Sequence, residues 1–140
     1  MMRRAVFSPM ARETERVRAF VAQVMGCWRL ARRFSEDEVK LVVTELFSNA
    51  VRHARHGGNG VEVMVSWEDG VVRVEVHDPD PRLPQMRELT GLDELSGRGL
   101  ILVDALTSRW GARPKRAGGK YVFAELAELK AAGVAPEPAV

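Results

Sequence analysis

The chain has 140 residues, of which 46% are hydrophobic and 29% charged, a size and composition typical of one soluble globular domain. The formal net charge is only +2, and the arginines are scattered rather than gathered in a stripe, so nothing indicates nucleic-acid binding. One cysteine, Cys27, excludes an internal disulfide and a cysteine-based zinc site, and no apolar run reaches the roughly 18 residues of a membrane span. We therefore expect a cytoplasmic protein, with Cys27 in the core of the first helix rather than acting as a nucleophile.

The N-terminal part predicts a short strand followed by a helix. Ala5-Val6-Phe7 is expected to form an edge strand, which Ser8-Pro9 ends. From about Ala11 to Leu30, apolar residues recur at helical spacing. The residues expected to share the buried face are Val17, Phe20, Val21, Val24 and Met25.

The stretch Ser35 to Gly58 predicts the central helix. Its first residue is a good N-cap, Glu38 completes a capping box, and the glycine pair at its end stops it. Glu45 and Asn49 are four residues apart, so they stack at the rim of the apolar face, with His53 one turn further. A carboxylate and an amide in this arrangement can jointly hold a metal ion and a water, or can simply complete an amphipathic surface.

Two alternating segments predict a β-hairpin. Val61 to Trp67 and Val71 to Asp78 alternate between apolar and polar residues, and the Asp69-Gly70 pair between them favours a tight turn. Asp78 continues the parity of the valines in its strand, so we expect its side chain on the covered side of the sheet, where an acid needs a partner. It either caps a turn at Pro79 or binds something held between the sheet and the helices.

The rest of the chain combines an irregular segment, a glycine turn and a second hairpin. Asp80 to Ser96 has no regular period, and a loop of this length is usually functional or mobile. Gly97-Arg98-Gly99-Leu100 is expected to open a helix, where it suits a phosphate or acts as a hinge. Thr107 to Arg113 and Lys120 to Leu126 predict the closing hairpin. Residues 131–140 predict a flexible tail, which leaves residues 1–130 as the domain.

In this order the motifs resemble the GHKL ATPase family, which includes gyrase B and the sensor histidine kinases, and within it the anti-sigma-factor serine/threonine kinases. Glu45 to Ala54 resembles the N box, Asp78 the acid of the G1 box, and Gly97 to Leu100 the G2 box. Trp110-Gly111 and Gly119-Lys120 resemble the closing hairpin. The resemblance runs from about Phe7 to Leu129. It implies the Bergerat ATP-binding fold of the α+β class, a two-layer sandwich with a mixed, mostly antiparallel sheet and helices on one face.

The resemblance also implies a role for each motif residue. Asn49 would coordinate a Mg²⁺ that bridges the phosphates of ATP, Glu45 would act as the catalytic base, and His53 would lie near the phosphates. Asp78 would accept a hydrogen bond from the adenine amino group. Asp80 to Ser96 would be the ATP lid. The phosphates would be cradled by the backbone of Gly97, Arg98, Gly99 and Leu100.

Three positions depart from the family's pattern. Asp80 and Arg82 stand where the G1 box has glycines, and Tyr121 stands where a hydroxyl residue supports the adenine-binding acid. The phenol of Tyr121 could take over that hydrogen bond.

The resemblance implies an ATP-binding anti-sigma factor that phosphorylates a serine or threonine of an antagonist protein. Its partners would be a sigma factor and that antagonist, without nucleic acid or membrane, and related kinases often dimerise. One alternative is a non-catalytic, nucleotide-dependent protein-binding module. Another is the catalytic domain of a histidine kinase, against which the residues upstream of His53 contain no histidine.

Overall fold

The computed structural model describes residues 1–53, 60–79 and 94–129. Within these residues five strands form one sheet in the order β1-β2-β3-β5-β4, and every pairing is antiparallel. The strands are β1 (Met2–Phe7), β2 (Val61–Glu68), β3 (Val71–Asp78), β4 (Arg109–Pro114) and β5 (Lys120–Ala127). The edge position expected for the first strand is confirmed, since β1 pairs only with β2 among the described strands.

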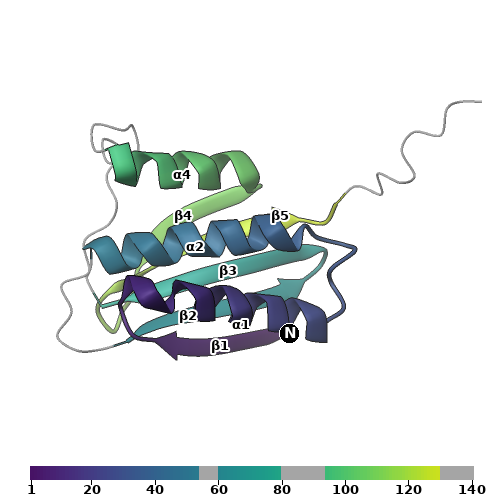
Figure 1. Ribbon diagram of the computed structural model, residues 1–140, viewed down its shortest axis with the longest axis horizontal. Helices are drawn as coiled ribbons and strands as arrows, with labels where there is room; N and C mark the ends of the chain where they lie inside the picture. The colour runs from purple at the N-terminus through teal and green to yellow at the C-terminus, as the bar shows by residue number, and fades with distance from the viewer. Residues whose placement is uncertain (54–59, 80–93, 130–140) are drawn as a thin grey trace, which may run out of the picture.

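The helices of the described residues all cover the same face of the sheet (Figure 1). They are α1 (Thr14–Cys27), which the 3₁₀ turn η1 (Ala11–Glu13) precedes, α2 (Glu36–His53) and α4 (Glu94–Leu106). Helix α2 lies between α1 and α4 (Figure 1) and packs on β3. The expected two-layer α+β sandwich is therefore confirmed, with antiparallel pairs only in the described part of its sheet.

The hairpin between β2 and β3 closes with the predicted tight turn. Asp69 and Gly70 have φ angles of 52° and 76°, and Glu68 pairs directly with Val71. Two successive residues at positive φ define the turn type whose twist matches that of the flanking strands. This turn fixes the register of β3, and the register decides which of its side chains face the helices.

Helix α2 supplies the centre of the core. The hydroxyl oxygen of Ser35 accepts a hydrogen bond of 3.2 Å from the backbone N–H of Glu38, which confirms the predicted N-cap. The apolar face of α2 is buried against the sheet, and each buried Val, Leu or Phe side chain on it contributes about 1.5–3 kcal/mol to the free energy of folding. Its buried residues are Val39, Val42, Val43, Leu46, Phe47 and Ala50.

The prediction that Cys27 lies in the core is wrong, because its side chain is exposed. Helix α1 buries a face made of Val17, Val21, Val24 and Met25. Cys27 is the last residue of this helix and falls outside that face. The cysteine therefore contributes no core packing.

The last helix begins earlier than expected. The glycine turn was predicted to open it at Gly97, but α4 already begins at Glu94, so the turn lies inside the helix. The other predictions for residues 54–59, 80–93 and 130–140 lie outside the described residues; they concern the end of the N box, the lid, Asp80, Arg82 and the tail.

Candidate functional site

Four chain segments meet at one end of the molecule. Figure 1 shows the C-terminal end of α2, the end of β3, the start of α4 and the turn between β4 and β5 on the same side. These segments carry or adjoin the N box, Asp78, the glycine turn and Lys120. The motifs that the sequence places far apart are thus brought to one end of the two layers.

Asp78 lies on the helix-facing side of the sheet, as its parity predicted. It is 5% exposed, and Val72, Val74 and Val76 of the same strand are also buried. A buried carboxylate is costly without a partner. One partner in the structure is Lys120, whose Nζ lies 3.1 Å from Oδ2 and 3.3 Å from Oδ1.

The role considered for Tyr121 is contradicted by the strand register. In the β3–β5 pair Asp78 is opposite Lys120, and His77 is opposite Tyr121. The ring of Tyr121 stacks on that of His77, at 5.1 Å between centroids, on the face away from the helices. The phenol therefore cannot support Asp78. The sequence signal for this was the shared parity of Val122, Ala124 and Leu126 with residue 120, which places Lys120 on the helix-facing side although Phe123 between them is apolar too.

The turn before β5 presses closely on the end of β3. Gly119 is buried with φ at 81°, and a Cβ there would lie 2.5 Å from the backbone oxygen of Asp78. A side chain at this position would displace the backbone of Asp78 or of Pro79. The glycine thus allows the close approach that holds Lys120 beside Asp78.

The N box residues lie on α2 with the predicted spacing. Glu45 and Asn49 are both half-buried, which fits the rim of the apolar face. His53 is the last residue of α2. The described residues contain no group of three or more His, Cys, Asp or Glu side chains that could hold a metal ion. A Mg²⁺ would fit here only if Asn49 supplied one oxygen and the phosphates of a nucleotide supplied others, a donor set that suits this ion.

The glycine turn occupies the first part of α4. The free N–H groups of a helix are those of its first four residues, here Glu94 to Gly97. Leu100 is 2% exposed and belongs to the core together with Val103. The phosphate-binding role of Gly97, Arg98, Gly99 and Leu100 stays a prediction. The free N–H groups that could bind a phosphate lie at the start of α4.

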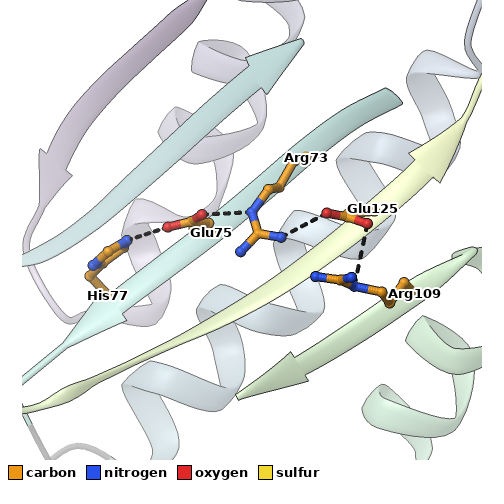
Figure 2. Close-up of polar contacts among 5 residues, drawn as sticks. All are labelled: Arg73, Glu75, His77, Arg109 and Glu125. Carbon is orange, nitrogen blue, oxygen red and sulfur yellow. Dashed lines mark hydrogen bonds and ion pairs between the residues drawn. The ribbon is translucent and has the colours of Figure 1, made fainter. Parts of the chain in front are cut away.

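A second polar cluster, which the sequence did not predict, lies on the opposite face of the sheet (Figure 2). Arg73 contacts Glu75 and Glu125 at 2.7 Å each, and Glu75 contacts the Nε2 of His77 at 2.7 Å. Arg109 lies 3.5 Å from Glu125. The pairs of Glu125 with Arg73 and Arg109 link β3, β5 and the edge strand β4 side by side.

The pKa values of two groups in this cluster are shifted. Burial disfavours the charged form of Glu75, but hydrogen bonds from His77 and Arg73 outweigh it and hold the pKa of Glu75 below its ordinary value. Burial also disfavours the charge of Arg73, and its hydrogen bonds to Glu75 and Glu125 outweigh that and raise its pKa. Both groups are therefore charged at neutral pH.

Phe123 explains why arginines gather on this face. Its side chain is on the uncovered side of the sheet, yet it is only 2% exposed. The guanidinium carbons of Arg73, Arg109 and Arg113 lie 4.1, 5.1 and 5.6 Å from its ring centroid. Guanidinium groups over an aromatic face are attracted to it and shield it from water. This cluster is a structural cover, separate from the end of the sheet where Asp78 lies.

The family model described as the histidine kinase-like ATPase domain matches residues 7–123. An uncharacterized protein of Streptomyces coelicolor is 35% identical over 74 residues, which cover 52% of this chain and 70% of that protein. Within the residues that the structure describes, no helix has both the length and the apolar character needed to cross a membrane.

Solved structures with a similar fold include two histidine kinases and the full-length protein ShkA in complex with AMPPNP. The histidine kinase domain of the Erythrobacter litoralis EL346 blue-light-activated kinase has a TM-score of 0.51 at 20% identity, over 84% of this chain and 60% of that one. Full-length ShkA in complex with AMPPNP has a TM-score of 0.55 at 19% identity, over 93% of this chain and 32% of that one. The Acinetobacter baumannii histidine kinase AdeS has a TM-score of 0.51 at 14% identity, over 93% of this chain and 70% of that one. At these identities the likeness establishes the fold alone.

Proposed function

The chain belongs to the histidine kinase-like ATPase family, which implies ATP binding, and we propose that it is a cytoplasmic regulator that sequesters a sigma factor and phosphorylates an antagonist protein. The acceptor on the antagonist is a serine or threonine hydroxyl. The chain spans 60% of the Erythrobacter kinase domain and 32% of ShkA, so what those whole proteins do is not transferred to it.

One observation supports nucleotide binding most strongly: a buried carboxylate stands at the end of β3, facing the helices. Asp78 is 5% exposed, where the other helix-facing residues of β3 are valines. An ionised group in an apolar layer lowers stability unless it is paired, and Asp78 is paired with Lys120 at 3.1 Å. A carboxylate at this place has the chemistry to accept a hydrogen bond from the exocyclic amine of adenine.

The phosphates would extend from the base toward α2 and the start of α4. Asn49 would offer its amide oxygen to a Mg²⁺, and the metal would neutralise the charge of the phosphates. The free N–H groups at the start of α4, next to Gly97, would donate to phosphate oxygens. His53 would lie near the phosphates, and Arg98 would add positive charge there.

Glu45 would handle the proton of the acceptor. In the transfer step the acceptor oxygen forms a bond to the γ-phosphorus, the bond from that phosphorus to the β–γ bridging oxygen breaks, and ADP leaves. The hydroxyl proton passes to the carboxylate of Glu45, which precedes Asn49 by one helical turn. A docked protein presents its hydroxyl already oriented, whereas free water does not, so we expect little hydrolysis without the antagonist.

The experiment combines labelled ATP, the protein and candidate antagonist proteins. We expect label on a serine or threonine of one antagonist with the wild type. Glu45→Gln should abolish that label, by at least about a hundredfold, while ATP still binds, because the amide keeps the shape but accepts no proton. Thr44→Ala on the same helix is the control and should keep both activities.

Binding of a sigma factor without any labelled antagonist would contradict the kinase proposal. It would leave the nucleotide-dependent binding module as the function. Label on the protein's own histidine would instead indicate a histidine kinase.

A further inference from the structure

Strand β4 forms an open edge of the sheet. It pairs with β5 on one side, and no other strand of residues 1–53, 60–79 and 94–129 pairs with it on the other. Both ends of the strand are exposed and its middle residues are half-buried. An edge strand presents a row of backbone N–H and C=O groups with which another chain can pair. The strand and the turn after it, residues 109–116, are called the β4 edge below.

The closing turn shows which backbone groups of β4 point outward. The N–H of Lys115 donates to the carbonyl oxygen of Gly119 at 3.0 Å, and this pair continues the register of β4 and β5. Residues that bond to the partner strand alternate in an antiparallel ladder, so the odd-numbered residues of β4 bond to β5. Trp110 and Ala112 therefore direct their N–H and C=O groups away from the sheet. Pro114 belongs to the same outward set, where its missing N–H removes no ladder hydrogen bond.

The β4 edge is strongly basic. Four of its eight residues are arginine or lysine, and none is acidic. The side chain of Arg109 lies 3.5 Å from Glu125 but stays 62% exposed. The other three basic side chains form no ion pair with a carboxylate in the described part of the chain; they are Arg113, Lys115 and Arg116.

We propose that the β4 edge binds an extended acidic segment of a partner protein, which adds to the sheet as a further antiparallel strand. Strand addition takes its affinity from main-chain hydrogen bonds and its specificity from alternate side chains. Charge complementarity identifies the ligand as acidic. A second copy of this chain fits poorly, because two antiparallel β4 edges would bring Arg109 and Arg113 of one copy against those of the other. The proposal does not depend on nucleotide binding.

The order of residues in the ligand follows from the two faces of β4. Residues directly opposite each other in an antiparallel pair have side chains on the same face. Arg109 and Arg113 lie over the ring of Phe123 on the uncovered face, so the ligand residues opposite them are acidic. Trp110 and Ala112 are half-buried and pack on the core, so the ligand residues opposite them are apolar. A segment of the pattern Glu-Val-Glu-Val-Glu meets both requirements, and its valines supply the backbone groups that bond to β4.

The test is a titration of the ¹⁵N-labelled wild-type protein with the peptide Glu-Val-Glu-Val-Glu, followed by NMR. We expect saturable binding with the largest shifts at the amides of Trp110 and Ala112. N-methylation of both valines should weaken binding at least about tenfold, because it removes two hydrogen bonds to the outward carbonyl groups. N-methylation of the first and central glutamates, whose N–H groups point away from β4, should leave the affinity unchanged. Equal affinity of the valine-methylated peptide would overturn the proposal.

Other polyanions and the arginine charges provide the remaining tests. A short single-stranded DNA that binds as tightly as the peptide would mean that the edge attracts any polyanion, and would overturn the proposal. Arg109→Gln combined with Arg113→Gln should weaken the peptide at least about fivefold, whereas Lys at both positions should keep the affinity. Arg12→Gln combined with Arg32→Gln removes the same charge from two exposed arginines elsewhere and is the matched control.

The lysine variant separates charge from structure. If Arg109 and Arg113 served only to cover Phe123, the Gln and Lys double variants would lose the peptide equally, which would overturn the proposal. Unchanged binding by the Gln double variant would also overturn it.

Discussion

The carboxylate of Asp78 and the ammonium of Lys120 lie 3.1 Å apart across the β3–β5 pair, on the side of the sheet that the helices cover. The contact joins the end of one strand to the start of another at the end of the molecule where α2 and α4 also arrive (Figure 1). It is the polar centre of the candidate site, and the first two expected outcomes below follow from it.

Asp78→Asn should weaken adenine nucleotides selectively. The amide retains the shape, but its acceptor is weaker and its NH₂ group opposes the amine of the base. We expect a loss of at least about tenfold in ATP affinity, with inorganic triphosphate bound as by the wild type. Competition binding with a fluorescent nucleotide measures both, and an equal loss for ATP and triphosphate would mean that Asp78 only supports the fold.

Gly119→Ala should disturb the site more than Gly118→Ala. Both glycines have positive φ, at 81° and 95°, so alanine is strained by about 1 kcal/mol at either position. A Cβ at Gly119 would also meet the backbone of Asp78 at 2.5 Å, whereas nothing lies within 4 Å of a Cβ at Gly118. Urea denaturation and ATP titration of the two variants check this. Equal stability and equal affinity would show that the close approach at Gly119 does not matter.

Asn49→Ala should remove magnesium-dependent nucleotide binding and leave the fold intact. The side chain is half-buried at the rim of α2, so its removal creates no large cavity. We expect ATP affinity in magnesium to fall at least about tenfold, to the level measured in EDTA. Ser48→Ala, the neighbouring half-buried residue, serves as the control. A variant that binds Mg-ATP as tightly as the wild type would exclude Asn49 as the metal ligand.

Glu75→Gln should lower stability at neutral pH but not in acid. The pKa of Glu75 lies below its ordinary value of 4.5, so the charged carboxylate stabilises the fold above about pH 4.5, and this contribution is lost as the pH falls through the folded-state pKa. We expect a deficit of about 1 kcal/mol at pH 7 that shrinks below pH 4. Urea denaturation at both pH values measures it, with Glu62→Gln on β2 as the control. A deficit independent of pH would contradict the role of the charge.

The order of elements and the burial of Asp78 could be predicted from the sequence, because both depend on local patterns. The Asp69-Gly70 pair fixed the turn, and the alternation of β3 fixed the side on which Asp78 lies. In β5 the parity of Val122, Ala124 and Leu126 also places Lys120 on the helix-facing side, but the aromatic residues Tyr121 and Phe123 obscure the alternation. The family's pattern pointed to Tyr121 instead, which is one residue away and therefore on the other face.

Other features depend on contacts between distant segments, which a local pattern does not contain. Phe123 is buried on the uncovered face with Arg73 from β3 and Arg109 and Arg113 from β4 over its ring. The exposure of Cys27 depends on where α1 ends relative to its buried face. The start of α4 depends on the backbone before Gly97, where the sequence has no regular period.

Titration of the wild-type protein with ATP and Mg²⁺, followed by thermal unfolding, tests the central claim most directly. A ligand that binds only the folded state raises stability, by about 2.7 kcal/mol at a concentration one hundred times Kd. We expect a saturable rise in Tm with ATP that is smaller for Asp78→Asn and for GTP. An unchanged Tm of the wild type at millimolar ATP and Mg²⁺ would contradict nucleotide binding at this site.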